Sequence, residues 1–172
     1  MDKETLGEGN WLRLVKKGKW EWVERNNSSG VVGLYAFTDD DQVVLVEQPR
    51  APLDSQTVLE IPAGLVGDIP GQRDEAKALA AHRELIEETG YEAGDQREIV
   101  ETPSAPGMSD ETINLYLARK LKKVGPGGGD ETEDITVVLV PMAEFNDYLR
   151  RRTAEGIWID PKVFAVPYFF GL

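Results

Sequence analysis

The sequence contains no cysteine among its 172 residues, which excludes disulfide bonds and thiolate metal sites. It has one histidine, His82, so a zinc site built from several histidines of one chain is not expected. No apolar run approaches the ~18 residues that a membrane-spanning helix needs. The first four residues are polar or acidic apart from Met1, and no signal-peptide core follows them. We therefore expect a reducing, cytoplasmic setting.

Positive charge is also scarce, because 19 Lys and Arg face 31 Asp and Glu, a net charge of −12. This balance argues against binding to nucleic acid or to an acidic membrane surface. It does not exclude an anionic substrate, since divalent cations can bridge a polyphosphate and acidic side chains. The length suits one domain with one core, and the hydrophobic share of 41% is ordinary for a folded protein.

The most informative stretch is residues 75–91, which reads EAKALAAHRELIEETGY. On a helix, Glu84, Glu87 and Glu88 project within roughly a third of a turn of one another, so their carboxylates repel. Bound cations would relieve this repulsion, and Mg²⁺ or Mn²⁺ suits such oxygen ligands. The stretch therefore predicts a helix that presents a metal site.

The same helix carries apolar residues on two nearly opposite faces, which predicts burial on both sides, between sheets. The glutamates would then lie along an edge between these faces. Asp74 is expected as the N-cap and Gly90 as the C-terminal stop. His82 lies away from the glutamates around the helix, so we expect a structural or surface role for it.

The rest of the chain predicts a mixed α/β pattern. Runs rich in β-branched residues predict strands over residues 31–37, 43–48, 57–61, 97–102, 112–118 and 135–140. Helices are expected over residues 142–153 and within 161–172. The stretch 64–74 and the glycine run 125–129 are expected to be loops, the second of them flexible.

Residues 1–30 are expected to form a β extension ahead of a domain that spans residues 31–172. Within it, segments 11–16 and 20–25 flank a glycine turn and predict a β-hairpin that holds three of the four tryptophans. The tryptophans fit either a small cluster on the domain or a dimer surface, since Trp is enriched at interfaces. The residues themselves leave both interpretations open.

From Glu75 onward, the helix reads E-x7-R-E-U-x-E-E-x-G-U, where U is a bulky apolar residue. This pattern resembles the Nudix box, G-x5-E-x7-R-E-U-x-E-E-x-G-U. The opening glycine of the box would fall on Ile69, and its equivalent here is Gly64, so the loop is longer than the pattern requires. The competing interpretation is a solvated helix with an acidic face. Such a helix usually pairs its glutamates with Lys or Arg one turn further on, and these partners are missing here.

The resemblance implies a Nudix-type α/β/α sandwich with mixed sheets that cleaves a nucleoside diphosphate linked to another moiety. It also implies roles for single residues. Glu84 and Glu88 would bind Mg²⁺, with Mn²⁺ as a substitute, and Glu87 would be a ligand or a close neighbour of the ligands. Arg83 would pair with one of these glutamates and fix its rotamer, and Glu75 would support the site.

Three further stretches resemble the ADP-ribose pyrophosphatase branch: 46–50 (VEQPR), 59–64 (LEIPAG) and 104–111 (SAPGMSDE). The resemblance makes the Ala63 carbonyl a metal ligand and Glu111 a general base or further metal ligand, with Glu131 and Glu133 as rivals. Arg50 can supply positive charge to a phosphate. The expected substrate-binding residues are Arg50, Glu60, Trp22, Pro106, Gly107 and Met108.

Together these features predict a Mg²⁺-dependent hydrolase of ADP-ribose or a related nucleoside diphosphate sugar. In that branch the enzymes are homodimers whose N-terminal segments help to build the partner's nucleoside site, so Trp22 or a neighbour would stack on a base. A GDP-mannose-type hydrolase is an alternative within the enzyme class. A non-catalytic Nudix-like nucleotide-sugar sensor is an alternative outside it, although sensors usually lose the box glutamates.

Overall fold

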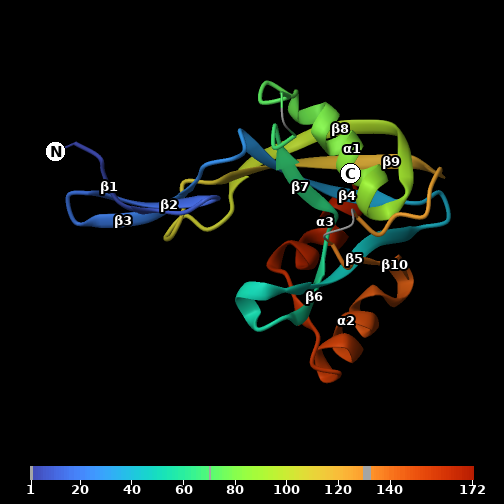
Figure 1. The fold of residues 1–172 in the computed structure, drawn as a ribbon. Helices are drawn as coiled ribbons and strands as arrows, with labels where there is room; N and C mark the ends of the chain where they lie inside the picture. The colour runs from blue at the N-terminus through green and yellow to red at the C-terminus, as the bar shows by residue number, and fades with distance from the viewer. Residues whose placement is uncertain (1, 70, 130–132) are drawn as a thin grey trace.

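Two β-sheets and three α-helices form the described part of the chain, which is residues 2–69, 71–129 and 133–172 of a computed structural model (Figure 1). The smaller sheet has the order β1-β2-β3 and extends away from the rest of the molecule (Figure 1). Its strands are β1 (Glu4–Glu8), β2 (Leu12–Lys17) and β3 (Trp20–Arg25).

The larger sheet has the order β11-β6-β5-β4-β9-β8, with β10 paired to β5 and β7 paired to β4. The pairs β4–β9 and β6–β11 are parallel and the others antiparallel, so the sheet is mixed as predicted. Its strands are β4 (Gly30–Phe37), β5 (Gln42–Arg50), β6 (Gln56–Glu60), β7 (Ala63–Val66), β8 (Tyr91–Pro103), β9 (Thr112–Lys123), β10 (Thr136–Pro141) and β11 (Trp158–Ile159).

Helices cover both faces of this sheet. α1 (Lys77–Thr89) packs on one face, while α2 (Phe145–Ala154) and α3 (Val166–Phe170) pack on the other. Short 3-10 turns adjoin them: η1 (Ala51–Leu53), η2 (Met142–Glu144) and η3 (Pro161–Ala165). The predicted α/β/α sandwich is therefore confirmed, and within the described residues no helix is both long and apolar enough to cross a bilayer.

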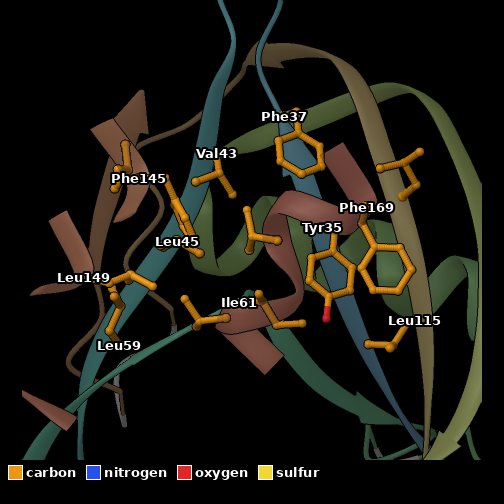
Figure 2. Packing of buried hydrophobic residues seen from close by; sticks show 14 of the residues in the cluster. Tyr35, Phe37, Val43, Leu45, Leu59, Ile61, Leu115, Phe145, Leu149 and Phe169 are labelled. Carbon is orange, nitrogen blue, oxygen red and sulfur yellow. The ribbon is translucent and has the colours of Figure 1, made fainter. Parts of the chain in front are cut away.

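Strand β4 runs through the middle of the sandwich and explains why its two faces carry separate cores. Its successive side chains point to opposite faces of the sheet. Tyr35 and Phe37 point toward the α2 and α3 layer, where Tyr35 stacks on Phe169 with ring centroids 4.2 Å apart (Figure 2). Val32 and Leu34 point instead toward α1. A continuous apolar run such as this one is typical of a strand buried on both faces.

The prediction that α1 is buried on two sides is wrong. Ala80, Ala81 and Leu85 are buried against the sheet, but Leu79 on another side of the helix is exposed. A helix on the outer layer of a sandwich has only one protein-facing side, and its second apolar stripe stays in solvent. Glu84 therefore lies on the buried face rather than on an open edge.

The ends of α1 agree only partly with the prediction. The helix begins at Lys77 with Ala76 in the N-cap position, and no side chain caps it, so Asp74 is not the N-cap. Gly90 does end the helix: it adopts a left-handed φ of 70°, and its N–H donates to the carbonyl of Ile86.

Two segments are more regular than predicted. The N-terminal extension has three strands rather than two, because β1 pairs with β2 of the hairpin. All five residues of β1 are exposed, so no alternation of buried and exposed residues indicated this strand. Part of the stretch predicted as a loop, residues 64–74, is strand: β7 pairs with β4 in antiparallel register. This pairing fixes the backbone of Ala63 and Gly64 beside α1.

The glycine run after β9 caps the C-terminus of α1, although the sequence suggested only a flexible loop. The N–H of Gly128 donates to the carbonyl of Glu88 at 2.8 Å, and that of Gly129 to the carbonyl of Glu87 at 3.0 Å. These bonds satisfy carbonyls that the end of a helix leaves unpaired. They also hold the glycine run against the helix that bears the glutamates.

We expect Gly127→Ala to destabilise the protein, because Gly127 has a left-handed φ of 72° and an added β-carbon would lie 2.5 Å from the carbonyl carbon of Thr89. The matched control is Gly156→Ala, which has a left-handed φ of 85° but open space around it. The control should cost roughly 1–3 kcal/mol from backbone strain alone, and Gly127→Ala should cost clearly more. Urea unfolding measures both, and equal losses would contradict the close packing of the glycine run on the end of α1.

Candidate active site

A cavity of about 630 Å³, the carboxylate cavity, opens beside α1 and collects most of the predicted site residues. Seven of them line it: Arg50, Glu60, Ala63, Arg83, Glu84, Glu87 and Glu111. Its other charged lining residues in the described part of the chain are Arg25, Asp68, Glu133 and Lys162. Carboxylates outnumber cationic side chains in this lining, so an anionic substrate would need additional positive charge there.

Two carboxylates of α1 are buried against the backbone of β7, and one of them, Glu84, lines this cavity. Glu84 is 8% exposed and Glu88 is 3% exposed. Glu88 accepts a hydrogen bond of 3.0 Å from the N–H of Ala63. A β-carbon on Gly64 would lie 1.9 Å from the carboxyl carbon of Glu84, so only glycine lets the β7 backbone approach that closely. The sequence Ala63-Gly64 therefore forms a backbone cradle for both carboxylates.

Burial controls how these two carboxylates titrate. Burial raises the pKa of Glu84 to about 7, against the opposing effect of the Arg83 guanidinium. Burial also raises the pKa of Glu88 well above its ordinary value, although the Ala63 N–H bond acts in the other direction. Near neutral pH the pair therefore favours either bound protons or a bound cation.

Arg83 holds the carboxylates around it in fixed positions. It donates to Glu75 at 3.1 Å, to Glu84 at 2.8 Å and to Glu87 at 3.0 Å. It also donates to the carbonyl of Leu65 at 3.0 Å. We expected pairing with one box glutamate, and the structure shows ion pairs with three glutamates of the motif.

Glu75 joins the loop before α1 to this network. Its carboxylate accepts the N–H of Gly67 at 3.0 Å as well as two bonds from Arg83. These contacts lower the pKa of Glu75, with the Arg83 bond as the main cause. Glu75 therefore anchors the loop while it remains ionised.

The donor set fits a divalent cation, even though no three acidic or imidazole groups of the described residues converge in a ready-made metal cluster. Glu84 and Glu88 offer buried carboxylate oxygens, and the peptide of Ala63 lies within hydrogen-bond distance of Glu88. Hard oxygen donors of this kind are what Mg²⁺ and Mn²⁺ prefer. A cation held by Glu84, Glu88 and the Ala63 carbonyl, with Glu87 beside it, would offset the buried charge.

The predicted base, Glu111, lies at the same cavity but belongs to the loop between β8 and β9. It accepts a bond from Arg25 of β3 at 2.9 Å and one from the hydroxyl of Ser104 at 3.2 Å. The rival Glu133 also lines the cavity, whereas Glu131 lies outside the described residues. Arg25 was not predicted as a site residue, although a basic residue at the end of a predicted strand was a usable signal.

Arg50 of β5 and Glu60 of the neighbouring strand β6 form a bidentate pair. Arg50 donates from Nε at 2.6 Å and from Nη2 at 2.5 Å to the two oxygens of Glu60. Two parallel bonds fix the plane of the guanidinium. Both residues were predicted on the substrate side, and the structure places both in the cavity lining.

The remaining predicted substrate-binding residues lie elsewhere. Trp22, Pro106 and Gly107 line a second cavity of about 850 Å³ between the small sheet and the β8–β9 loop. Met108 is exposed, and its carbonyl accepts the N–H of Val23 at 2.9 Å, which ties that loop to β3.

Sequence reasoning gave no separate role to Trp20, which also lines this tryptophan cavity and is largely exposed. The ring of Trp22 is more restricted, because its Nε1 donates to Glu24 at 3.0 Å. A third cavity, of about 230 Å³, shares Arg25 and Glu111 with the carboxylate cavity and Asp110 with the tryptophan cavity. The three cavities are therefore neighbours, arranged between α1 and the small sheet.

Comparison with known proteins gives consistent matches. A family model described as the NUDIX domain matches residues 28–160. The methanol dehydrogenase activator of Bacillus methanolicus is 35% identical over 140 residues, which are 81% of this chain and 71% of that protein. The ADP-ribose pyrophosphatase of Bacillus subtilis (strain 168) is 31% identical over 173 residues, 96% of this chain and 89% of that protein.

The GDP-mannose pyrophosphatase of Citrobacter koseri (strain ATCC BAA-895 / CDC 4225-83 / SGSC4696) is 33% identical over 137 residues, 76% of this chain and 68% of that protein. Among solved structures, a crystal structure titled as an ADP compounds hydrolase aligns with a TM-score of 0.67 at 22% identity. It covers 98% of this chain and 89% of that chain. At this identity the structural match supports the fold alone.

We expect the metal-free protein to lose stability as the pH rises from about 5 to about 8. The pKa of Glu84 is about 7 in the folded state against 4.5 ordinarily, so the folded state keeps a proton that the unfolded chain releases. Stability is therefore lost as the pH rises from the ordinary pKa through the folded pKa, and a bound cation removes this loss. Thermal unfolding in EDTA and in Mg²⁺ should show a larger Mg²⁺ stabilisation, by several degrees, at the higher pH.

The control variant is Glu84→Gln, which cannot ionise. Its metal-free melting temperature should depend less on pH, and Mg²⁺ should stabilise it less. If Mg²⁺ shifts the melting temperature of Glu84→Gln as much as that of the wild type, the cation binds somewhere else.

Proposed function

The chain belongs to the NUDIX family, and from this we propose that it hydrolyses the pyrophosphate bond of ADP-ribose or of a related nucleoside diphosphate sugar. The products would be a nucleoside monophosphate and a sugar phosphate. The observation that carries the proposal is the pair of buried carboxylates on α1: Glu84 lines the carboxylate cavity, and Glu88 lies one turn further on, bonded to the N–H of Ala63 in the same cavity lining. The named activities of the pyrophosphatase relatives support the substrate class.

We propose Mg²⁺ as the cation, with Mn²⁺ as a substitute. When bound, it would offset the negative charge of the diphosphate oxygens and acidify a water molecule. Glu84, Glu88 and the carbonyl of Ala63 would hold it. Glu87, kept in place by Arg83, would stand beside these ligands.

The other cavity residues then have roles that follow from their contacts. Arg50, with its guanidinium plane fixed by Glu60, would bind an oxygen of the diphosphate. Glu111 would accept the proton of the attacking water, and Arg25 orients its carboxylate. Glu133 is the alternative base because it lines the same cavity.

The tryptophan cavity suits the base of the nucleoside. Trp20 and Trp22 supply aromatic surface there, and Pro106 adds a further apolar wall. Because the third cavity shares lining residues with both of the others, one extended substrate would place its diphosphate near α1 and its base near the small sheet.

We further propose that the chain is a homodimer that associates through its N-terminal extension, residues 1–30. The small sheet projects from the body and exposes several large apolar side chains, which are Leu6, Trp11, Leu12, Leu14 and Trp20. Such a cluster on a thin sheet is typical of an interaction surface. The cytoplasmic location expected from the sequence remains a prediction.

A substrate panel with and without Mg²⁺ tests the catalytic proposal. Wild-type protein should release the nucleoside monophosphate from ADP-ribose or GDP-mannose only when the cation is present. Glu88→Gln should lower kcat by roughly a hundredfold or more, because it removes a buried ligand charge. The control is Glu92→Gln, a half-exposed glutamate on β8 outside the cavity lining, which should retain activity.

Two outcomes would contradict the enzyme proposal. If Glu88→Gln kept its metal-dependent turnover unchanged, the catalytic metal site would not lie on α1. Binding of ADP-ribose by the wild type without any turnover on the panel would favour the sensor alternative.

Light scattering at micromolar concentration tests the dimer. The wild type should have the mass of two chains, and Leu14→Asp on β2 should give monomers. Leu139→Asp is the matched control, because Leu139 is 41% exposed against 39% for Leu14 but lies on β10 of the large sheet. A monomeric wild type, or dissociation by the control alone, would contradict this interface.

A further inference from the structure

One cation of the carboxylate cavity comes from the C-terminal part of the chain and has no role in the reaction described above. Lys162 lies in η3, and it lines the same cavity as Arg50, Glu84 and Glu87. This segment reaches the cavity because β11 pairs in parallel with β6.

The backbone of Lys162 is held in a defined position. Its N–H donates to Oδ1 of Asp160 at 2.8 Å, and its carbonyl accepts the hydroxyl of Tyr35 at 3.0 Å. Tyr35 belongs to the central strand β4 and is packed on Phe169 (Figure 2). Burial raises the pKa of Tyr35 to about 12, so the phenol stays a neutral donor. The next residue, Val163, is fully buried.

The side chain of Lys162, by contrast, is held only lightly. Its Nζ lies 2.8 Å from Oδ2 of Asp160, within the same short turn, and the side chain is 28% exposed. A partly exposed ion pair of this kind contributes little net free energy, so it can be exchanged for another anion at low cost. An ammonium group has three N–H donors, and Asp160 uses one of them in this contact.

Arg83 and Arg50 of the carboxylate cavity are committed more firmly, and Arg25 holds the candidate base Glu111. Arg83 is bound to the carboxylates of α1 and of the preceding loop, and Arg50 is held by two short bonds to the buried Glu60. Breaking either contact would leave a buried carboxylate without its partner, which is costly. The backbone of Lys162 is thus fixed, while its ammonium group can exchange Asp160 for another anion. A residue that binds an incoming phosphate needs both properties.

We propose that Lys162 binds a phosphate oxygen of the substrate's diphosphate, and that this contact replaces its ion pair with Asp160. The inference rests on the proposed function and adds a substrate-binding residue to it. Because the diphosphate is common to all nucleoside diphosphate sugars, Lys162 contributes affinity for the whole class and does not distinguish their bases or sugars.

The test compares two variants that break the same ion pair from opposite sides. Lys162→Met keeps the aliphatic stem and removes the charge. Asp160→Asn removes the partner's charge but keeps an oxygen that can accept the Lys162 N–H. KM and kcat are measured for ADP-ribose and for GDP-mannose, with melting temperatures to verify folding.

Lys162→Met should raise KM about tenfold for every nucleoside diphosphate sugar that the wild type turns over, with kcat changed by less than about twofold. Asp160→Asn should leave KM unchanged or lower it, because it frees the ammonium. Lys162→Arg should recover part of the lost affinity. A purely structural ion pair predicts that Lys162→Met and Asp160→Asn raise KM alike, and that result, or an unchanged KM in Lys162→Met, would overturn the proposal.

Failure of the proposed function is distinguishable from failure of this inference. If the wild type turns over none of the substrates, the proposed function fails. The lysine is then tested by calorimetric binding of inorganic pyrophosphate in the presence of Mg²⁺. Weaker binding by Lys162→Met but not by Asp160→Asn supports the phosphate contact, and equal binding by all three proteins overturns it.

Discussion

The burial of two carboxylates against one short stretch of backbone is the constraint on which the rest of the structure depends. Glu84 and Glu88 lie on the sheet-facing side of α1, where desolvation disfavours their charged forms. The contacts around them reduce that cost: the N–H of Ala63 donates to one carboxylate, and the absent side chain of Gly64 makes room for the other. The pairing of β7 with β4 is what holds this backbone in place. A cation is the natural complement of such a cradle.

The same constraint explains why both ends of α1 are tied to loops, one directly before the helix and one far from it in sequence. Glu75 and Arg83 connect the start of the helix to the loop after β7. The glycine run after β9 donates N–H groups to the carbonyls of Glu87 and Glu88 at the other end. A helix whose buried face carries charge gains less from apolar packing, so its position depends more on specific polar contacts.

The sequence was sufficient to predict the α1 carboxylates, because fixed helical spacing and a long motif place them without tertiary information. It was also sufficient for the central strands, whose β-branched runs are continuous. The sequence was not sufficient where contacts with distant segments determine burial. Leu79 and Leu85 are equally apolar, and only the position of the sheet determines that Leu85 is the buried one. The strand β7, the capping glycines and the contributions of Arg25 and Lys162 depend on contacts between segments far apart in sequence, which leave no local period to read.

The ion pairs of the carboxylate cavity imply that its cations have different roles. Each of the four basic side chains among the described lining residues already pairs with a carboxylate, so a phosphate either binds their remaining N–H donors or displaces the carboxylate. Pairs with a buried carboxylate, such as Arg50–Glu60, resist exchange and fix geometry. Partly exposed pairs, such as Arg25–Glu111 and Lys162–Asp160, exchange at low cost. Exchange at Arg25 would remove the contact that orients Glu111 as the candidate base. In a chain of net charge −12, Lys162 is therefore the cation that can turn to an anion without disturbing that base.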